Sequence, residues 1–307
     1  MDFLPMLSRF AVLSQNKLRH PIEVKTNQPL AAYSSMRTAG TAEAVAFPSD
    51  VKDLSFLVTF LSENGIDFIL LGKGTNTLFA SDRYKGLIVS TERINFIRSE
   101  GVKIKAGAGV SLTRLCRFAA EAGLSGLECF YGIPGTVGGA VAMNAGAFGA
   151  SFSDLAPISR ILTKDGEEKT ILPDEHAFSY RNSRFLSEPQ SVLLETEFVL
   201  TPSCRLDIYD AMERYMAKRR EKQPLEYSSL GSIFKRCEDA YPAKLLEEAG
   251  LKGFSLGGAS VSEKHAGFIV NKGGASGADV LSLVEYIEAL IYQKYKIRLV
   301  PEIRIVR

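Results

Sequence analysis

The sequence predicts an α+β fold in two domains, and three observations support this prediction. Residues 44–71 place an amphipathic helix between two short apolar strands, which is the pattern of a β-α-β unit. Glycines gather in two segments, 72–77 and 132–149. Toward the C-terminus the chain instead alternates longer helices with short strands. We therefore divide the chain into domains of residues 1–203 and 204–307.

Hydrophobic periodicity and capping residues give the bounds of the expected elements. The first two helices begin after a Ser or Asp that can cap them and end near a glycine, and the strands are short apolar runs bounded by turn residues. The expected elements are a docking helix in the N-terminal segment 1–30, strands over 44–47, 68–71 and 87–90, helices over 51–64 and 111–122, a hairpin over 158–173 that turns at Asp165-Gly166, a charged helix with Tyr209, Met212, Tyr215 and Met216 on its apolar face, helices over 243–249 and 280–291, and a last strand over 299–306.

The composition is that of a globular protein with nearly balanced charge. The chain has 307 residues, with 37 Lys and Arg against 35 Asp and Glu, and 46% of its residues are hydrophobic. This length and composition exclude a disulfide-stapled miniprotein. No basic tract indicates a nucleic acid partner, and no apolar run approaches the roughly 18 residues of a membrane span. The N-terminus lacks the positive charge of a signal peptide, so we expect a cytoplasmic protein, and we expect it to be a monomer.

The cysteines and histidines give no support for a metal site or a disulfide. The four cysteines form no CxxC pair, and the three histidines have no metal-ligand spacing. We expect neither feature.

The two glycine segments indicate ligand binding, although they fail the best-known nucleotide motifs. Gly72-Lys73-Gly74 lacks the GxxxxGK[ST] spacing of a P-loop, and Thr77 stands where the GxGxxG fingerprint requires its third glycine. Glycines most commonly serve tight turns. Two segments this glycine-rich and apolar favour instead a pair of loops whose backbone N–H groups clasp one diphosphate.

The two glycine segments belong to a longer series of motifs. The second segment contains Gly132-Ile133-Pro134-Gly135 and Asn144-Ala145-Gly146-Ala147, Tyr180–Phe185 has the pattern YRxSxF, and Gly231–Lys235 has the pattern GSxFK. This series resembles the UDP-N-acetylenolpyruvoylglucosamine reductase (MurB) family, in which the first glycine segment is similar to the phosphate loop and the second to the flavin-binding core. The resemblance covers about residues 30–307. The absence of a long insertion after YRxSxF resembles the type II branch.

The resemblance implies the fold, the reaction and the cofactors. It implies an FAD-binding domain of the PCMH (vanillyl-alcohol-oxidase-like) type with two subdomains over 1–203, and a smaller α+β substrate domain over 204–307. It also implies reduction of UDP-N-acetylglucosamine enolpyruvate to UDP-N-acetylmuramate in peptidoglycan precursor synthesis, with NADPH as hydride source and noncovalent FAD as relay. The implied FAD-binding residues are Gly72, Gly74, Thr75, Asn76, Thr77, Gly132, Pro134, Gly135, Thr136, Gly138, Gly139, Asn144 and Gly146.

The resemblance further implies three catalytic residues. Ser232 matches the proton donor of the family, Arg181 its charge stabiliser, and Glu302 a residue that reaches the enolate. Taken alone, these residues permit simpler roles, since a Gly-Ser pair commonly caps a turn, an arginine stacks on a neighbouring tyrosine, and a strand glutamate faces solvent. The basic run Lys218-Arg219-Arg220 is equally compatible with a solvated helix face and with attraction of a diphosphate.

The chain departs from the family pattern at a few positions. Arg236-Cys237 stand where the family has Asn-Pro, Ser228-Ser229-Leu230 replace Pro-Ser-Ala, and Thr75 replaces a serine. The first two changes lie on the substrate side, whereas Thr75 keeps the hydroxyl. Two other functions stay open: an FAD-dependent oxidase of an alcohol or sugar, and a catalytically silent nucleotide-sugar binding protein.

Overall fold

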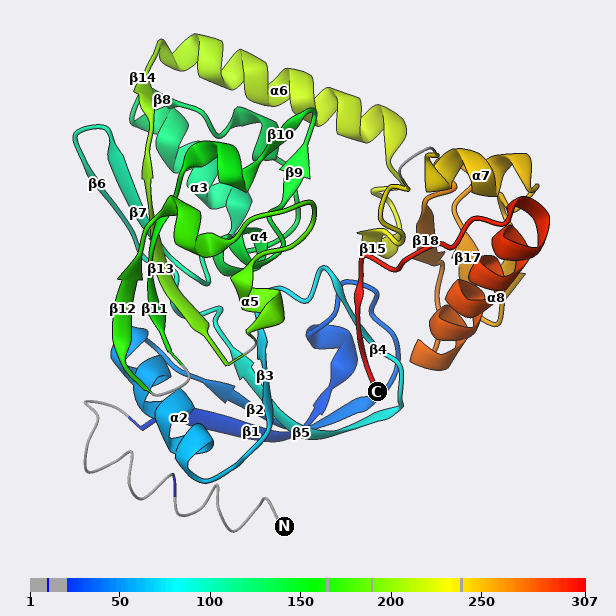
Figure 1. Ribbon diagram of the computed structural model, residues 1–307, viewed down its shortest axis with the longest axis horizontal. Helices are drawn as coiled ribbons and strands as arrows, with labels where there is room; N and C mark the ends of the chain where they lie inside the picture. Colours follow the sequence, from blue (N-terminus) through cyan, green and yellow to red (C-terminus); the bar gives the residue numbers. More distant parts are fainter. Residues whose placement is uncertain (1–9, 11–20, 164–165, 189, 238–239) are drawn as a thin grey trace. The chain divides into compact units, whose positions relative to one another are not determined.

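The computed structural model describes residue 10 and residues 21–163, 166–188, 190–237 and 240–307 (Figure 1). The chain divides into two compact units. The first unit contains Ala44–Gly72, Gly86–Met216 and the residues up to Thr26. The second unit contains Asn27–Glu43, Lys73–Lys85 and Ala217–Arg307, so the chain enters it three times.

The first unit begins with a helix packed on a four-stranded sheet. The sheet has the order β1-β2-β5-β3, and β3 runs parallel to β5 from the pair Phe68↔Leu87 to the pair Leu71↔Ser90. Helix α2 begins after Asp50, whose side chain accepts a hydrogen bond of 2.9 Å from the Asp53 N–H. The buried residues of α2 share one apolar cluster with those of β2 and β5. The bounds are β1 Glu23–Pro29, β2 Thr41–Phe47, α2 Val51–Glu63, β3 Phe68–Leu71 and β5 Arg83–Ser90.

A five-stranded antiparallel sheet forms the rest of the first unit. Its order is β12-β11-β13-β7-β6. Helices α3 and α4, capped by the side chains of Ser111 and Thr136, bury their apolar residues in one core with β7 and β13. The bounds are β6 Ile97–Glu100, β7 Lys103–Gly107, α3 Leu112–Glu121, β8 Leu124–Ser125, η2 Glu128–Phe130, α4 Val137–Ala142, β9 Gly146–Ala147, β10 Ala150–Ser151, η3 Phe152–Leu155, β11 Ile158–Leu162, β12 Glu168–Ile171, η4 Pro173–His176, α5 Arg184–Ser187, β13 Val192–Val199, β14 Thr201–Pro202 and α6 Arg205–Lys222.

The second unit is built on a four-stranded antiparallel sheet of order β15-β18-β17-β16. Helix α8 packs on β16 and β17, and α7 packs against α8 (Figure 1). Met36 and Leu78 share the core of this unit with the buried face of α8. Strand β19 runs parallel to β4, from Arg304↔Thr77 to Val306↔Phe79. The bounds are η1 Leu30–Ala32, β4 Thr77–Phe79, β15 Ser228–Ser232, α7 Pro242–Glu248, β16 Ser255–Leu256, β17 Ala259–Val261, β18 Phe268–Asn271, α8 Gly277–Tyr295 and β19 Arg304–Val306.

Most of the expected elements are present, and two differ from the expectation. The last strand is Arg304–Val306 rather than 299–306, because Pro301, which has no N–H to donate, makes only an isolated bridge to Phe234. Tyr209 is 37% exposed, and Ile208 takes its expected place beside Met212 in the core. Among the described residues, no helix combines the length and the apolar character that a membrane crossing requires.

Parts of three expectations are not tested by this fold. Most of the predicted N-terminal docking helix, residues 1–9 and 11–20, lies outside the described residues, and so does Asp165 of the predicted hairpin turn. Phe10 is described, and its ring lies 5.0 Å from that of Phe60 on α2. The division into an FAD-binding domain, 1–203, and a substrate domain, 204–307, stays a prediction.

His176 lies in a buried chain of polar groups in the first unit. The side chain is fully buried, with Nδ1 2.9 Å from the Leu172 carbonyl oxygen and Nε2 2.9 Å from Ser159 Oγ. Because a carbonyl oxygen can only accept, Nδ1 carries the proton and Nε2 accepts from the serine. Burial lowers the pKa of His176, and the carbonyls of Leu172 and Pro173 oppose this shift. The imidazole is therefore neutral in the folded protein near neutral pH.

We expect His176 to make the protein less stable in acid. An unfolded histidine binds a proton below about pH 6.5, whereas the folded pKa is lower. The unfolded state then binds more protons, so stability is present above about pH 6.5 and is lost as the pH falls toward the folded pKa. Urea unfolding at about pH 7.5 and about pH 5.5 should show a larger loss for wild type than for His176→Gln, by up to about 1.4 kcal/mol per pH unit. Equal pH dependence in the two proteins would contradict the assignment.

Candidate functional site

Gly72, the first residue of the first glycine segment, lies close to the second segment inside the first unit. Gly72 follows β3, and a Cβ added to it would lie 2.3 Å from Oγ1 of Thr136 in the second segment. Thr136 Oγ1 caps α4 by accepting a hydrogen bond of 3.2 Å from the Gly139 N–H. A side chain at position 72 would displace this cap. Gly72 is therefore required by the packing against Thr136 of the second segment.

The first glycine segment presents backbone N–H groups suited to an anion. Within the described part of the chain, the N–H groups of Gly72, Lys73, Gly74 and Thr75 donate to no other residue. The loop is nevertheless fixed, because the Gly74 carbonyl accepts a hydrogen bond of 3.1 Å from the Ser35 N–H. Successive N–H groups in a turn form a concave site for phosphate. These residues therefore fit the diphosphate of FAD.

Some residues of the second glycine segment pack against neighbouring chain segments, and others are exposed. The Gly138 N–H donates to the Ala108 carbonyl, 2.8 Å, and a Cβ at Gly138 would lie 3.0 Å from the same oxygen. Gly138 therefore serves the packing of α4 on the neighbouring chain. The Gly135 carbonyl accepts a hydrogen bond from the Leu112 N–H, 3.2 Å, which holds the start of α3. Pro134 and Gly139 are exposed, and Gly132 is half-buried, so a ligand can reach these positions.

Gly139 offers a test of the diphosphate position. A Cβ at Gly139 would make an ordinary contact, 3.5 Å from Thr136 Oγ1. Gly139→Asp should not lower the melting temperature, because a carboxylate is favourable in the first turn of a helix. It should weaken FAD binding about tenfold to a hundredfold through charge repulsion, whereas the uncharged Gly139→Asn should weaken it much less. Titration of FAD into the apoproteins measures both affinities, and equal values would place the diphosphate elsewhere.

Arg181 occupies a turn position that favours glycine. The backbone of Ser179–Asn182 closes with two hydrogen bonds, 3.0 and 3.2 Å, and Arg181 has a φ of 52° in this turn. The left-handed backbone destabilises a residue that carries a side chain by about 1–2 kcal/mol. The guanidinium donates to the carbonyl oxygens of Asn144, 3.4 Å, and Gly146, 3.0 Å. It also lies 5.4 Å from the ring centroid of Tyr180, so the stacking expected from the sequence is present as well.

Two substitutions at Arg181 measure the backbone strain. Arg181→Gly and Arg181→Ala both remove the guanidinium, but only glycine adopts a positive φ without strain. We expect the glycine variant to be more stable than the alanine variant by about 1 kcal/mol in urea unfolding. If the alanine variant were equally stable, the turn would not be strained at this residue.

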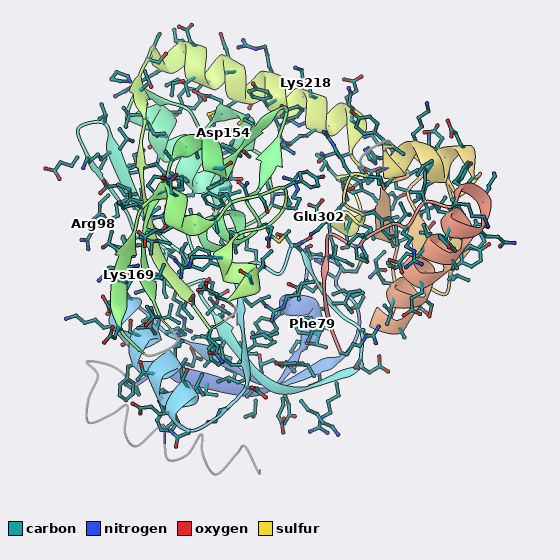
Figure 2. All side chains as sticks on the ribbon, in the orientation of Figure 1. Phe79, Arg98, Asp154, Lys169, Lys218 and Glu302 are labelled. Atoms are coloured by element: carbon teal, nitrogen blue, oxygen red, sulfur yellow. The ribbon has the colours of Figure 1, made fainter. Side chains whose placement is uncertain are left out.

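The second unit brings Ser232 and Glu302 to neighbouring positions. Ser232 ends β15, where the register against β18 shifts by one residue, and Gly231 takes a φ of 77° in this bulge. Such bulges commonly redirect the side chain that follows them. The Glu302 N–H donates to the Ile233 carbonyl, 2.7 Å, so Glu302 (labelled in Figure 2) lies beside the residue that follows Ser232. Arg181 belongs to the first unit, and Ser232 and Glu302 belong to the second.

Ser35 links the first glycine segment to β15, and the sequence analysis did not single it out. Its N–H donates to the Gly74 carbonyl, 3.1 Å, and its Oγ donates to the Ser229 carbonyl, 2.6 Å. Both acceptors are backbone atoms distant in sequence. No local pattern could have signalled these contacts.

Asn76 and Thr77, both predicted to bind FAD, make contacts within the second unit. Asn76 Nδ2 donates to the Glu302 carbonyl, 3.0 Å, and the Asn76 carbonyl accepts from the Arg304 N–H, 2.8 Å. Thr77 is buried in β4, and its carbonyl accepts a hydrogen bond of 2.7 Å from Ser34 Oγ. The loop predicted to bind the diphosphate and the segment that carries Glu302 are therefore held together by hydrogen bonds.

The structure also shows the environment of Arg219, from the basic run, and of Arg236 and Cys237, which depart from the family pattern. Arg219 is only 5% exposed, which rules out a solvated helix face for this residue. Arg236 is exposed, with its guanidinium 5.2 Å from the ring centroid of Tyr241. Burial raises the pKa of the Cys237 thiol, so its reactive thiolate form is less populated.

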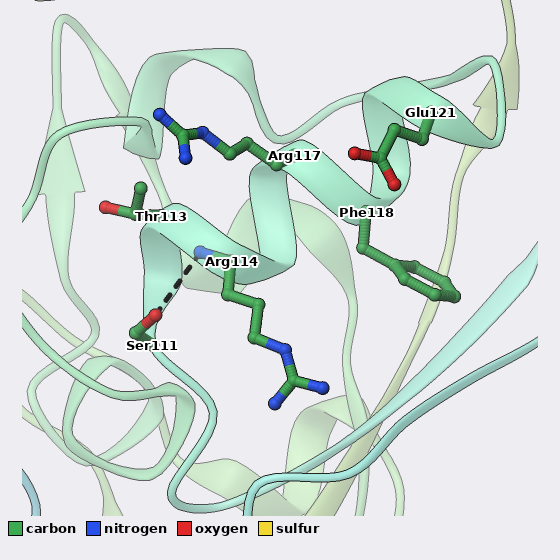
Figure 3. A pocket seen from close by; sticks show the side chains of 6 residues that line it. All are labelled: Ser111, Thr113, Arg114, Arg117, Phe118 and Glu121. Atoms are coloured by element: carbon green, nitrogen blue, oxygen red, sulfur yellow. Dashed lines mark hydrogen bonds between the residues drawn. The ribbon is translucent and has the colours of Figure 1, made fainter.

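A surface hollow of about 350 Å³ lies on helix α3 (Figure 3). Two arginines on its wall are held by the protein itself: Arg114 donates to the Asn95 carbonyl, and Arg117 donates to the Tyr131 hydroxyl, 3.1 Å. The hollow contains none of the residues that the sequence assigns to FAD or to catalysis. We therefore do not assign it to the candidate site. Its lining residues are Ser111, Thr113, Arg114, Arg117, Phe118 and Glu121.

Comparison with known proteins identifies the family. A family model described as an FAD binding domain matches residues 42–171, and one described as the C-terminal domain of UDP-N-acetylenolpyruvoylglucosamine reductase matches residues 223–306. The curated UDP-N-acetylenolpyruvoylglucosamine reductase of Latilactobacillus sakei is 41% identical over 93% of this chain and 94% of the relative. The relative from Fervidobacterium nodosum is 42% identical, over 91% of this chain and 90% of its own length.

A solved structure supports the same relationship. The crystal structure of UDP-N-acetylenolpyruvylglucosamine reductase (MurB) from Thermus caldophilus matches with a TM-score of 0.78 and 28% identity, over 93% of this chain and 99% of that chain. The predicted α+β fold with an FAD-binding domain is confirmed. The chain is an FAD-dependent oxidoreductase and belongs to the UDP-N-acetylenolpyruvoylglucosamine reductase family.

Proposed function

We propose that the chain uses NADPH to reduce the enolpyruvyl ether of UDP-N-acetylglucosamine to the lactyl ether of UDP-N-acetylmuramate. This is a step of peptidoglycan precursor synthesis, and we place it in the cytoplasm with the chain acting as a monomer. The observation that carries the proposal is that Glu302 lies beside the residue that follows Ser232, through the 2.7 Å hydrogen bond from the Glu302 N–H to the Ile233 carbonyl. The backbone segments that carry a proton donor and a carboxyl group are thus adjacent, which suits this substrate.

The reaction sets two tasks for the residues of the chain. When bound, FAD would take a hydride from NADPH and deliver it to the substrate, which no amino-acid side chain can do. Hydride addition to the methylene carbon leaves negative charge on the neighbouring carbon and its carboxylate. The chain must hold this charge and must protonate that carbon.

Arg181 is suited to the charge and Ser232 to the proton. A planar guanidinium pairs with a carboxylate through two parallel hydrogen bonds, which a lysine cannot reproduce. A serine hydroxyl is a weak acid, so it can protonate only a strongly basic carbon that lies in line with it. The bulge at Gly231 fixes the backbone that carries this hydroxyl. Glu302, when protonated, can donate a hydrogen bond to the enolate.

A single assay separates this function from the two alternatives. NADPH consumption that needs the enolpyruvyl substrate and no oxygen supports the reductase. Oxygen consumption with an alcohol or a sugar would favour an oxidase. A flavin-containing protein that turns over neither substrate would favour a silent binding protein.

The role of Ser232 predicts that only one half-reaction depends on it. Ser232→Ala should allow flavin reduction by NADPH at a near-normal rate, because no enolate exists in that step. It should slow flavin reoxidation by the enolpyruvyl substrate by about 10²–10⁴-fold, the usual contribution of a positioned general acid. Stopped-flow absorbance of the flavin measures both steps.

Ser255→Ala is the matched control, because Ser255 is an exposed serine on β16 of the same unit and has no proposed role in the site. It should leave both half-reactions within about twofold of wild type. If Ser232→Ala slowed reduction by NADPH as much as reoxidation, Ser232 would not be the proton donor.

A further inference from the structure

We infer that Asn144 and Gly146 form a platform that positions Arg181, and that the Asn144 amide and the carbonyls of both residues serve this arginine rather than the flavin. The inference rests on the proposed function of Arg181, and it differs from the expectation that both residues bind FAD. Asn144, Gly146 and Arg181 all belong to the first unit. Three sets of contacts support it.

The backbone of Asn144 ends helix α4 in a conformation for which glycine would be the usual choice. Its N–H donates to the Val141 carbonyl, 3.1 Å, and the Ala145 N–H donates to the Ala140 carbonyl, 2.8 Å. This pair of bonds is a Schellman motif, in which the residue after the helix is left-handed. Asn144 has the φ of 41° that the motif requires. The helix end alone would be satisfied by glycine, so the amide side chain needs another explanation.

The amide of Asn144 holds the turn that carries Arg181. Nδ2 donates to the Ser179 carbonyl, 3.0 Å, and Oδ1 accepts from the Ser153 N–H, 2.9 Å. Ser179 is the first residue of the strained turn, and Asn144 is only 7% exposed, so both bonds are shielded from water. The buried amide therefore fixes the position of the turn relative to the end of α4.

The guanidinium of Arg181 contacts the segment that contains Asn144 and Gly146. It donates to the carbonyl oxygens of Asn144, 3.4 Å, and Gly146, 3.0 Å. A Cβ at Gly146 would lie 2.7 Å from the Ala150 carbonyl oxygen and 3.0 Å from Arg181 Nη1, so a larger residue would meet both the neighbouring strand and the guanidinium. The Asn144 amide thus holds the backbone turn that carries Arg181, and the carbonyls of Asn144 and Gly146 hold its guanidinium.

The two carbonyls orient the guanidinium through groups that bear no net charge, so these contacts do not offset its positive charge. An anionic substrate group is attracted to that charge, and the protein sets the position of the guanidinium. Displacement of a catalytic group by about 1 Å can slow a reaction about a hundredfold. Asn144 is then a positioning residue for the step that needs Arg181.

A double-mutant cycle on the holoenzyme tests the inference. Asn144→Gly keeps the left-handed backbone and removes only the amide. We expect FAD affinity and flavin reduction by NADPH within about twofold of wild type, and reoxidation by the enolpyruvyl substrate slowed about tenfold to a hundredfold. In the Arg181→Ala background, the same substitution should change reoxidation by less than about twofold, because the residue acts through Arg181.

The outcomes separate this inference from the proposed function. If wild-type reduced flavin is not reoxidised by the enolpyruvyl substrate, the proposed function fails. If wild type reacts but Asn144→Gly weakens FAD binding, or slows reduction as much as reoxidation, Asn144 serves the flavin and the inference is overturned. Independent, multiplicative effects of the two substitutions would overturn it as well. Should Asn144→Gly fail to fold, Asn144→Asp, which cannot donate to the Ser179 carbonyl, replaces it in the same cycle with the same expected result.

Discussion

Close contact between backbone segments is the constraint on which both units depend. In the first unit, Gly72 leaves room for the Thr136 hydroxyl that caps α4. In the second unit, a Cβ at Gly74 would lie 1.9 Å from the Tyr33 carbonyl oxygen, and a Cβ at Gly277 would lie 1.9 Å from the Phe79 carbonyl oxygen. A side chain at any of these positions would force the backbone apart. The glycines near the proposed diphosphate site are therefore required by the packing of the chain as well as by a ligand.

The parts of the fold that the sequence predicts are those that local chemistry determines. The Asp50 cap and the apolar face of α2 lie within one stretch of chain, and so does the buried face of α8. The pairing of β19 with β4 joins residues more than 200 positions apart, and no periodicity carries that information. Pro301 illustrates the same limit, since alternation predicts a long strand there and the missing N–H confines it to an isolated bridge.

The candidate site shows a similar division between residue identity and residue role. Motif similarity singles out Asn76, Gly138 and Asn144, but it assigns all three to FAD. In the structure, the Asn76 amide donates to the Glu302 carbonyl, Gly138 packs against Ala108, and the Asn144 amide donates to the Ser179 carbonyl. An amide or a missing Cβ is visible in a sequence, whereas the atom that it contacts is not. Residues of one motif can therefore serve the cofactor, the packing of a helix or the placement of another side chain.

The position of Arg181 connects the fold to the chemistry. Glycine would relieve the left-handed turn by about 1–2 kcal/mol, yet it would remove the only part of this residue that can bind an anion. The strained backbone persists because hydrogen bonds from a separate segment offset it: the Asn144 amide binds the start of the turn, and the carbonyls of Asn144 and Gly146 bind the guanidinium. Asn144 itself belongs to the Schellman end of α4, whose first turn is capped by Thr136. Because Thr136 also lies against Gly72, this short helix connects Gly72 to Arg181 within the first unit.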